Sequence, residues 1–561
     1  MTAPTTAAVA EMLREYGRRL SLSGGNPYRA RAYVRAADTL ASLGEPLAEL
    51  IAADRLTELP GIGDAIAAII GTMHRTGTYP KLQEMRNELP AGVLEMLAVP
   101  GLRPDKVLKI YRQLGITSLA GLEEAARSGR IANTKGLGAS LQTKILQNIE
   151  IAKSGEHRLH MNRANTLLTH AAARLEKAEG VKRVSVAGDL RRGCELIGRL
   201  ALVVEANGIS ESPPASSSRS ELEVHVSDAQ HFGAMLLEAT GSAAHLEALR
   251  TFAKRKGYRL DARGLWRARK LIAGASEADI YDSLGLQFIP PELREGGDEI
   301  QLAEHNQIPA LVGDRDIRGI LHAHTDSSDG VNTLAEMADA TRSRGYEYFG
   351  VADHSKSAHY AGGLSVAEIT AQQKAADRLN RTFGGSFQIF KGIESDILAD
   401  GSLDYPDDVL ARFDFVVASV HSRFRLDPKE QTRRIVNAVS SPYTTILGHM
   451  TGRQLLRRPA YEVDVEVVLK ACARHGVAVE VNANPWRLDL DWRWHQRALE
   501  LGCMLSINPD AHSTDEIDLT HWGVEMARKG GVPAGRVLNC LPLTAFRRHL
   551  EKRKKRMRRA A

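Results

Sequence analysis

The sequence predicts a multidomain chain of α+β and α/β architecture, with a helical N-terminal part, a mixed central part and a C-terminal barrel of βα units. Its 561 residues are enough for roughly three or four domains of usual size. Helical stretches joined by Pro-Gly turns occupy the beginning of the chain. Towards the end, apolar runs of strand length alternate with helical stretches, as parallel βα units require.

A repeated turn joins helical stretches in the N-terminal part. Two good copies lie at 59–66 and 99–107, and a weaker copy lies at 135–138. Glycine permits a tight turn, and backbone N–H groups at the next helix start can meet a DNA phosphate. One such turn fits any helix–turn–helix unit, but the repetition favours helix-hairpin-helix DNA binding. The expected contacts are Gly61, Gly63, Gly101 and Arg103.

Arg103 stands where the hairpin motif prefers glycine. Its side chain would either prevent the tight turn or contact a phosphate itself. The sequence leaves both alternatives open.

The central part contains a motif with two adjacent arginines. Segment 186–198 reads Val-Ala-Gly-Asp-Leu-Arg-Arg-Gly-Cys-Glu-Leu-Ile-Gly and resembles the palm motif G-S-x-R-R-G-x-E-x-x-G of family X DNA polymerases. Segments 26–33, 240–245 and 284–295 resemble the start of that family's helical domain and its later palm and thumb. The polar, Pro/Ser-rich stretch 208–220 is expected to be a flexible loop between two palm strands.

The same motif lacks the carboxylates that the resemblance implies. A polymerase of this family continues with D-x-D, which holds two ions together with a third carboxylate on a later strand. Arg199 and Ala201 occupy the D-x-D positions, and Glu223 is the best match to the third. Asp189 replaces the family's phosphate-contacting serine and would repel a triphosphate. We therefore predict that polymerase activity is lost.

Clusters of metal-binding side chains run through the C-terminal part. Apolar runs that predict buried strands precede most of them, at 348–351, 387–390, 415–418 and 445–447, with helices expected at 334–344 and 365–381. A barrel of parallel strands collects its site at the C-terminal face of the strands. The candidates are six histidines and three carboxylates: His322, His324, Asp329, His354, Glu394, His421, His449, Asp510 and His512.

These ligand types suit two or three divalent ions. His322 and His324 are two residues apart, so on a strand both side chains point to one face. Glu394 can bridge two ions, and the carboxylates favour Mn²⁺ or Mg²⁺, with Zn²⁺ as a further choice for the imidazoles. A multinuclear site of this kind usually hydrolyses a phosphate ester.

Residues from about 315 to 545 resemble a PHP (polymerase and histidinol phosphatase) domain, whose fold is a distorted seven-stranded βα barrel with a trinuclear site. Together, the two resemblances cover nearly the whole chain, in the bacterial arrangement that joins a family X polymerase to a PHP domain. The PHP resemblance implies three ligand sets: His322, His324, Glu394 and Asp510; Glu394, His421 and His449; and Asp329, His354 and His512.

The expected catalytic group contains Glu394, Asp510, Asp353 and Arg487. Asp353 would orient a metal ligand or only cap a turn. Arg487 lies in segment 480–489, which resembles the PHP family's substrate-side loop, and would meet a phosphate or pair with Asp489. The sequence leaves both choices open.

Composition places the chain among cytoplasmic proteins with no membrane partner. The four cysteines show no close pairing, which fits a reducing compartment. Neither a signal peptide nor an uncharged run of membrane-spanning length is present. The net charge of +6 depends on the tail 552–559, which carries seven Lys/Arg residues. Such a tail holds nucleic acid phosphates weakly, or is only a solvated, disordered end.

These features divide the chain into six expected segments: 1–85, an N-terminal helical domain with the first hairpin; 86–155, a fingers-like helical domain with further hairpins; 156–303, a degenerate palm and thumb; 304–314, a linker; 315–550, the metal-dependent phosphoesterase domain; and 551–561, the basic tail.

The resulting prediction is a DNA-repair nuclease. The polymerase half would grip gapped, nicked or 3′-ended duplex DNA, and the PHP domain would act as a 3′–5′ exonuclease and phosphodiesterase with Mn²⁺, Mg²⁺ or Zn²⁺. Three alternatives stay open: a gap-filling polymerase with PHP proofreading, a small-molecule phosphatase of the histidinol-phosphate type, and a non-catalytic DNA scaffold. The sequence names no protein partner.

Overall fold

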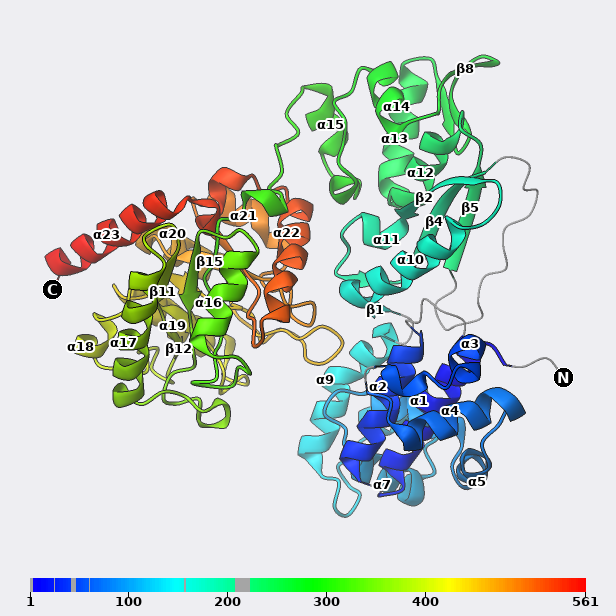
Figure 1. The fold of residues 1–561 in the computed structure, drawn as a ribbon, viewed down its shortest axis with the longest axis horizontal. Helices are drawn as coiled ribbons and strands as arrows, with labels where there is room; N and C mark the ends of the chain where they lie inside the picture. Colours follow the sequence, from blue (N-terminus) through cyan, green and yellow to red (C-terminus); the bar gives the residue numbers. More distant parts are fainter. Residues whose placement is uncertain are drawn as a thin grey trace.

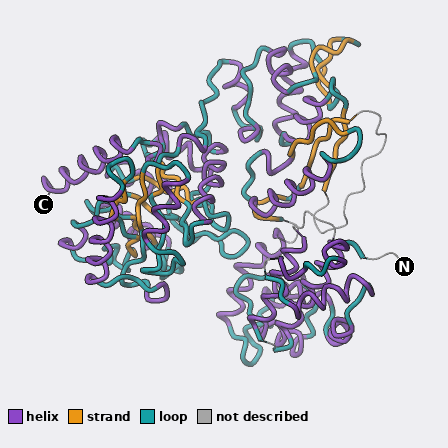
Figure 2. The backbone as a smooth tube through the Cα atoms, in the orientation of Figure 1, coloured by secondary structure: helices purple, strands orange, loops and turns teal. Residues whose placement is uncertain are grey.

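The computed structural model describes residues 4–24, 26–41, 47–59, 61–155, 158–206 and 222–560. They form an N-terminal helical part, a central mixed part and a C-terminal part (Figure 1). Figure 2 shows strands in the central and C-terminal parts and only helices and loops in the described N-terminal residues. The loop expected at 208–220 lies outside the described residues, between β4 (Leu200–Ala206) and β5 (Leu222–Ser227).

The N-terminal part packs amphipathic helices around two apolar clusters. Val9, Leu13 and Tyr16 repeat at helical spacing and bury one face of the first helix. The first cluster lies among the first five helices, and the second lies among the last four. The described helices are α1 (Thr6–Leu22), α2 (Pro27–Ala41), α3 (Leu47–Ala52), α4 (Asp64–Thr76), α5 (Pro80–Glu88), α6 (Ala91–Glu95), α7 (Pro104–Leu114), α8 (Leu119–Arg127) and α9 (Ala139–Gly155).

The first two hairpin turns share one backbone conformation. Gly61 and Gly101 have φ of 77° and 76°, in the left-handed region that favours glycine. Gly63 and Arg103 follow two residues later with φ of −95° and −73° and extended ψ, and each is the N-cap of the next helix. Any residue adopts this conformation, so Arg103 does not cost the tight turn. Its side chain is 71% exposed and lies 3.3 Å from the carboxylate of Asp105.

The central part has a three-stranded sheet in which β2 pairs antiparallel and β5 pairs parallel with β4, followed by an antiparallel sheet of three short strands. The remaining elements are β1 (Leu159–His160), α10 (Met161–Leu175), β2 (Val181–Ala187), α11 (Gly188–Arg191), β3 (Leu196–Ile197), α12 (Phe232–Thr240), α13 (Ala243–Arg255), β6 (Arg259–Asp261), β7 (Gly264–Arg267), β8 (Lys270–Ala273), α14 (Glu277–Leu284) and α15 (Glu299–Glu304).

The C-terminal part alternates parallel strands with helices, as predicted. The helices expected at 334–344 and 365–381 are α16 and α17. The elements are β9 (Gly319–Ile320), α16 (Leu334–Ser343), β10 (Tyr348–Val351), α17 (Val366–Thr382), β11 (Gln388–Lys391), β12 (Glu394–Asp396), α18 (Asp407–Leu410), β13 (Val417–Ser419), α19 (Pro428–Ser440), β14 (Ile446–Leu447), α20 (Val465–His475), β15 (Ala478–Asn482), α21 (His495–Glu500), β16 (Leu505–Asn508), α22 (Thr520–Lys529) and α23 (Leu543–Ala560).

The strands of the C-terminal part close into a distorted barrel. They form two parallel sheets, in the orders β11-β10-β9 and β12-β13-β14-β15-β16. Parallel bridges between Ala323 and Ala511 and between His354 and Glu394 join the sheets just beyond the strand ends. Because β11 and β12 are separated by only two residues, they act as one bent strand, and the barrel has seven. β9 ends at Ile320, so His322 and His324 lie just after the strand rather than on it.

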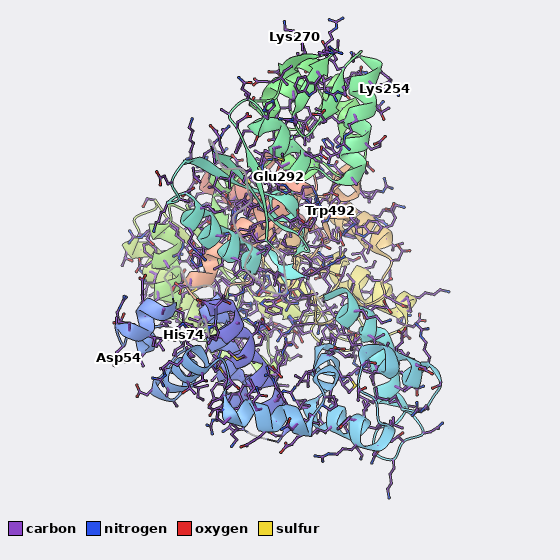
Figure 3. The ribbon with its side chains drawn as sticks, turned by 90° about the vertical axis from the view of Figure 1, so that its right-hand side faces the viewer. Asp54, His74, Lys254, Lys270, Glu292 and Trp492 are labelled. Carbon is purple, nitrogen blue, oxygen red and sulfur yellow. The ribbon has the colours of Figure 1, made fainter. Side chains whose placement is uncertain are left out.

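The central and C-terminal parts share a continuous apolar cluster, which includes Met161 and Leu202 on one side and Met526 and Leu490 on the other. Charged contacts surround it. Arg528 of α22 lies 2.6 Å from Glu292. The neighbouring Lys529 bonds to Glu295 at 2.6 Å and lies over the ring of Trp492 at 4.8 Å. Figure 3 labels Glu292 and Trp492 at this junction.

The basic segment 552–559 belongs to α23, which continues to Ala560. Lys554 pairs with Asp414 at 2.8 Å, and Arg553 donates to the backbone carbonyl of Gly476. The structure therefore does not describe a disordered end here. Among the described residues, no helix has both the length and the apolar character to cross a membrane.

Candidate metal centre

The candidate ligands lie at the carboxyl ends of the barrel strands. His322 and His324 follow β9, His354 follows β10, and Glu394 begins β12. Three further strands deliver the others in the same way: His421 follows β13, His449 follows β14, and Asp510 and His512 follow β16. Parallel strands thus bring distant residues to one face of the barrel. All nine predicted ligands meet there.

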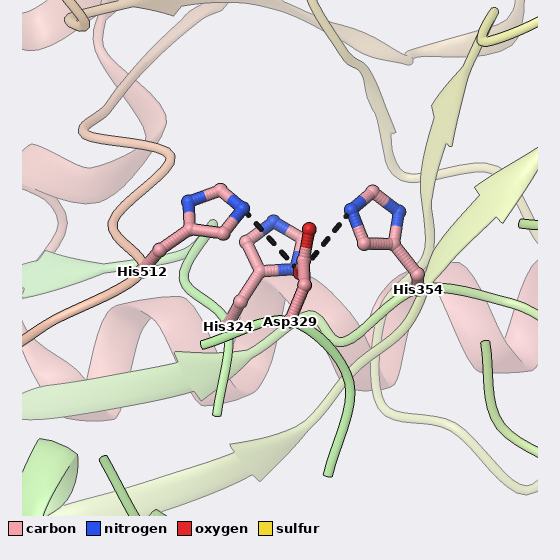
Figure 4. Close-up of side chains that lie close together, drawn as sticks. All are labelled: His324, Asp329, His354 and His512. Atoms are coloured by element: carbon pink, nitrogen blue, oxygen red, sulfur yellow. Dashed lines mark ion pairs between the residues drawn. The ribbon is translucent and has the colours of Figure 1, made fainter. Parts of the chain in front are cut away.

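One group of ligands surrounds Asp329. Its carboxylate Oδ1 lies 3.4 Å from His512 Nε2, 3.5 Å from His354 Nε2 and 3.7 Å from His324 Nδ1. Figure 4 shows these four side chains converging. Their ligand atoms lie within 4.8 Å of one another, so they could hold one ion. His324 thus joins the set that the PHP resemblance implied for Asp329, His354 and His512.

Glu394 is the hub of the rest of the site. Its side chain is 1% exposed, and its Oε1 lies 3.0 Å from His449 Nε2, 3.2 Å from His421 Nε2 and 3.4 Å from His322 Nε2. Its Oε2 lies 3.0 Å from His354 Nδ1. A single carboxylate that meets these four imidazoles, and a fifth through its Oε2 at 3.7 Å from His324 Nε2, has the geometry expected of a bridging ligand.

Asp510 completes the group on the opposite side. Its Oδ1 lies 3.1 Å from His324 Nε2 and 3.5 Å from His322 Nε2. These three residues form a second set that could hold an ion, and His354, Glu394 and His421 form a third.

Several buried ligand atoms have no hydrogen-bond partner among the described residues: His322 Nε2, His324 Nδ1, His354 Nδ1 and Glu394 Oε2. Buried polar atoms in proteins are almost always satisfied. Imidazole nitrogens and carboxylate oxygens that converge in this way suit divalent cations, which would bind their free lone pairs.

The charges of the metal centre favour the binding of cations. Burial opposes ionisation of Glu394 and Asp510, yet the surrounding imidazoles hold the pKa of both carboxyls well below its usual range. Burial likewise disfavours the charged form of His421, but Glu394 and Asp396 raise its pKa to about 10. His324 differs, since burial and the nearby His512 lower its pKa to about 3. Carboxylates that stay ionised in a buried site attract cations.

Two supporting carboxylates were missed by the sequence analysis. Glu480 on β15 accepts a hydrogen bond from His322 Nδ1 at 2.6 Å, and Asp396 on β12 accepts one from His421 Nδ1 at 2.6 Å. Each fixes the imidazole so that its Nε2 faces the centre. The sequence did offer one indication for Asp396. It lies two residues after Glu394 on one strand, so both side chains point to the same face.

Tyr360 is another missed residue beside the ligands. Its ring is 72% exposed and lies 6.2 Å from His354 and 6.5 Å from His421.

Asp353 stabilises the loop between His324 and Asp329 by accepting hydrogen bonds from it. It is fully buried and accepts hydrogen bonds from Thr325 N at 2.7 Å, Ser328 Oγ at 2.5 Å and Gln372 Nε2 at 2.6 Å. No described imidazole bonds to it, so the turn-capping alternative matches its contacts. These hydrogen bonds hold the turn between His324 and Asp329, and the catalytic role expected of Asp353 stays a prediction.

Arg487 points to the centre. Its Nε lies 3.4 Å from Asp510 Oδ2, and its charge helps to lower the pKa of His449, which burial already lowers. The pairing with Asp489 is not seen, because Asp489 is fully buried and accepts a hydrogen bond from the backbone N–H of Thr451 at 2.9 Å. Arg487 thus supplies positive charge beside the candidate ligands.

The hairpin residues lie in the N-terminal part, outside the metal centre. Apart from the chain neighbours, no atom of the described residues lies within 4 Å of the position that a Cβ would take on Gly61 or Gly63, so this turn has an open surface. Beside Gly101 lies the side chain of Lys144. An open, glycine-lined turn with nearby basic groups is suited to phosphate contact.

The charged side chains of the central motif are paired with nearby groups of opposite charge or with backbone N–H groups. Arg199 Nη2 lies 3.2 Å from Glu223 Oε2. Asp189 accepts hydrogen bonds from the backbone N–H groups of Gly198 at 3.0 Å and Arg199 at 2.9 Å, and pairs with Arg192 at 2.9 Å.

Comparisons with known protein families match the N-terminal and central parts. Residues 4–79 match a helix-hairpin-helix domain, residues 93–149 match a SAM-like helix-hairpin-helix tandem, and residues 235–295 match the DNA polymerase beta thumb.

Individual proteins extend the similarity. The DNA polymerase/3′-5′ exonuclease PolX of Bacillus subtilis is 32% identical over 549 residues, which is 93% of this chain and 95% of the relative. A probable phosphatase of Thermoanaerobacter sp. is 26% identical over 235 residues, 39% of this chain and 88% of the relative. A probable phosphatase of Vibrio campbellii is 29% identical over 228 residues, 39% of this chain and 86% of the relative.

Proposed function

We propose that the C-terminal barrel hydrolyses phosphodiester bonds at the 3′ ends of DNA, because this chain belongs to the family of the bacterial DNA polymerase/3′-5′ exonuclease PolX. The chain is a phosphoesterase by its similarity to PolX and to the probable phosphatases. The observation that carries the proposal is the convergence of five imidazoles on the buried carboxylate of Glu394. We keep the six segment boundaries given above as part of the proposal.

Two or three divalent ions would occupy the centre, with Mn²⁺ preferred over Mg²⁺ or Zn²⁺. We assign His322, His324 and Asp510 to one ion, His421 and His449 to a second, and Asp329, His354 and His512 to a third, with Glu394 as a bridge. Such cations supply Lewis acidity towards phosphoryl oxygens and water.

The protein's own groups orient the reaction. Glu480 and Asp396 hold His322 and His421 with Nε2 facing the centre. Arg487 is placed to meet a non-bridging phosphate oxygen, since a guanidinium binds phosphate well and stays charged. Asp353 keeps the 325–328 turn closed and so keeps His324 and Asp329 at their places.

The remaining two parts would bind the DNA. Both hairpin regions and the thumb match families found in DNA-binding proteins, and we propose gapped, nicked or 3′-ended duplexes as ligands. We also propose that the palm does not polymerise, because the ion pair of Arg199 with Glu223 takes the place of a carboxylate cluster. A cytosolic location follows from this role.

The test is hydrolysis of 3′-labelled duplex DNA by the purified protein with Mn²⁺, Mg²⁺ or Zn²⁺, and after chelation with EDTA. The proposal expects release of mononucleotides that depends on the added ion. Release of phosphate from small monoesters without any DNA cleavage would support a small-molecule phosphatase and contradict the proposal.

A further inference from the structure

The central part touches the loop that carries Arg487 at two places. A two-stranded ribbon, β1 with β3, forms the edge of the central part that faces the barrel. His160 is the last residue of β1 and pairs in register with Leu196 of β3. Glu195 lies immediately before that partner. The ribbon therefore presents His160 and Glu195 next to each other, and both reach residues of the barrel.

His160 packs on the residue before Arg487. Its ring centroid lies 4.0 Å from that of Trp486, and its Nε2 lies 3.2 Å from the carbonyl oxygen of Leu455. The backbone N–H of Leu455 donates in turn to the carbonyl of Trp486 at 2.6 Å. Arg457 lies over the same indole, 4.7 Å from its centroid. The indole is thus fixed by contacts from two parts of the chain.

Glu195 acts on the other end of the loop through Arg453. The carboxylate of Glu195 lies 3.4 Å from Arg493 and 3.8 Å from Arg453. Arg453 pairs with Asp491 at 2.7 Å. It also donates to the carbonyl of Arg487 at 3.0 Å and to that of Leu488. The side chain of Arg453 is only 10% exposed, so its hydrogen bonds are little disturbed by solvent.

The loop needs this support. Leu488 is a fully buried, non-glycine residue with φ of 45°, a left-handed conformation that costs of order 1 kcal/mol and persists only where surrounding contacts fix it. Arg487 precedes it, and the guanidinium of Arg487 reaches to 3.4 Å from Asp510. A small displacement of the loop would move that guanidinium away from the ligands.

We propose that His160 and Glu195 are positioning residues for the C-terminal metal centre. Through Trp486 and Arg453 they fix the loop 484–491 so that Arg487 faces the phosphate of the substrate. The degenerate palm then supports hydrolysis by positioning Arg487, in addition to any binding of DNA. This inference rests on the proposed phosphodiesterase function.

The experiment compares His160→Ala and Glu195→Ala with two matched controls in the full-length protein. His231→Ala removes a central histidine that stacks on Trp266 at 6.5 Å, and Glu238→Ala removes a central glutamate paired with Arg250 at 2.6 Å. In the described part of the chain, His231 contacts Asp228 and Trp266, and Glu238 contacts Arg250, which all lie in the central part. Hydrolysis of a small chromogenic phosphodiester is measured with Mn²⁺, because this substrate is too small to need the hairpins.

We expect kcat to fall about tenfold in both test variants, since misplacing a binding group by about 1 Å can cost up to roughly 10²-fold. Bound Mn²⁺ should stay at the wild-type level, and the controls should match the wild type. In an Arg487→Ala background, Glu195→Ala should cause no further loss, because both changes remove one interaction. Additive losses, or kcat unchanged in both test variants, would overturn the proposal.

Hydrogen–deuterium exchange of peptides covering 484–491 gives a readout that does not need activity. We expect faster exchange there in the two test variants and wild-type exchange in the controls. Exchange that stays the same in the test variants would contradict the positioning role even if kcat fell. A wild type that hydrolyses neither DNA nor the small diester would instead refute the proposed function, and the exchange result would still decide whether the palm fixes the loop.

Discussion

Arg199, the residue just before β4, forms an ion pair with Glu223 on the neighbouring parallel strand β5, with Nη2 of the arginine 3.2 Å from Oε2 of the glutamate. Ala201, on β4, lies directly opposite Glu223 in the register. At the place where two carboxylates would face a third, the chain therefore has a cation and a methyl group. A guanidinium fixed beside Glu223 opposes the binding of a second cation there.

The first prediction concerns nucleotide binding by the palm. In a Glu394→Ala background, which removes the competing metal centre, we expect no Mn²⁺-dependent binding of a deoxynucleoside triphosphate in calorimetry. Adding Arg199→Asp, Ala201→Asp and Asp189→Ser should create such binding, because two new carboxylates join Glu223 to complete a set of three and a repelling charge is removed. Arg199→Lys serves as the control, since it keeps the positive charge. Tight triphosphate binding in the Glu394→Ala background alone would show that Glu223 suffices.

The second prediction concerns the hub of the metal centre. Glu394→Ala should lose bound metal and nearly all hydrolysis, because several kcal/mol of transition-state stabilisation depend on the ions that it helps to hold. That loss corresponds to on the order of 10²-fold or more in rate. Metal content by mass spectrometry and DNA cleavage are measured together. Glu336→Ala is the control, because Glu336 only caps α16 in the same barrel. Wild-type cleavage by Glu394→Ala would refute the site.

The third prediction concerns DNA contact at the first hairpin. Gly63 has an extended backbone, open space around it and the N-cap position of α4, so both Gly63→Asp and Gly63→Ser fit the structure. Only aspartate adds a negative charge that repels a phosphate. We expect Gly63→Asp to weaken binding of gapped DNA at low salt, with Gly63→Ser close to wild type. Equal affinity in fluorescence anisotropy for all three proteins would place the DNA elsewhere.

The fourth prediction concerns the acid stability of the central part. Burial opposes ionisation of Glu277, but hydrogen bonds from Arg191 at 2.6 Å and from Arg294 at 2.5 Å lower its pKa to about 2. A depressed folded-state pKa gives stability that is present above the unfolded value of 4.5 and is lost as pH falls towards 2. The contribution at neutral pH is about 3 kcal/mol.

Exchange of peptides covering α14 should therefore accelerate in the wild type between about pH 5 and pH 2. In Glu277→Gln the exchange should already be fast at pH 7 and should change less over this range. Parallel pH profiles for the two proteins would exclude Glu277 as a source of acid sensitivity.

The sequence was sufficient to predict the barrel and to bring the candidate ligands together at one face, because the signal is strong and local. Most ligands follow an apolar strand, and parallel topology then places them at one face, as with His354 after β10 and His449 after β14. The repeated Pro-Gly likewise predicted tight turns at Gly61 and Gly101, whose φ values of 77° and 76° lie in the left-handed region.

Other features depend on tertiary contacts that no local pattern encodes. The choice between turn cap and ligand orienter for Asp353 required the positions of Thr325 and Gln372. The partner of Arg487 could not be predicted because Asp510, which it meets, follows β16 and is distant in the sequence. Contacts between the palm ribbon and the barrel link residues about 300 positions apart, so His160 gave no signal in the sequence.

The central claim is that the barrel cuts DNA while the palm does not extend it. The most direct measurement incubates a one-nucleotide-gapped duplex, labelled on its primer strand, with Mn²⁺ and all four deoxynucleoside triphosphates. We predict that the wild type shortens the primer from its 3′ end and that Glu394→Ala leaves its length unchanged. Template-directed lengthening by Glu394→Ala, abolished by Glu223→Ala, would contradict this account and establish a gap-filling polymerase.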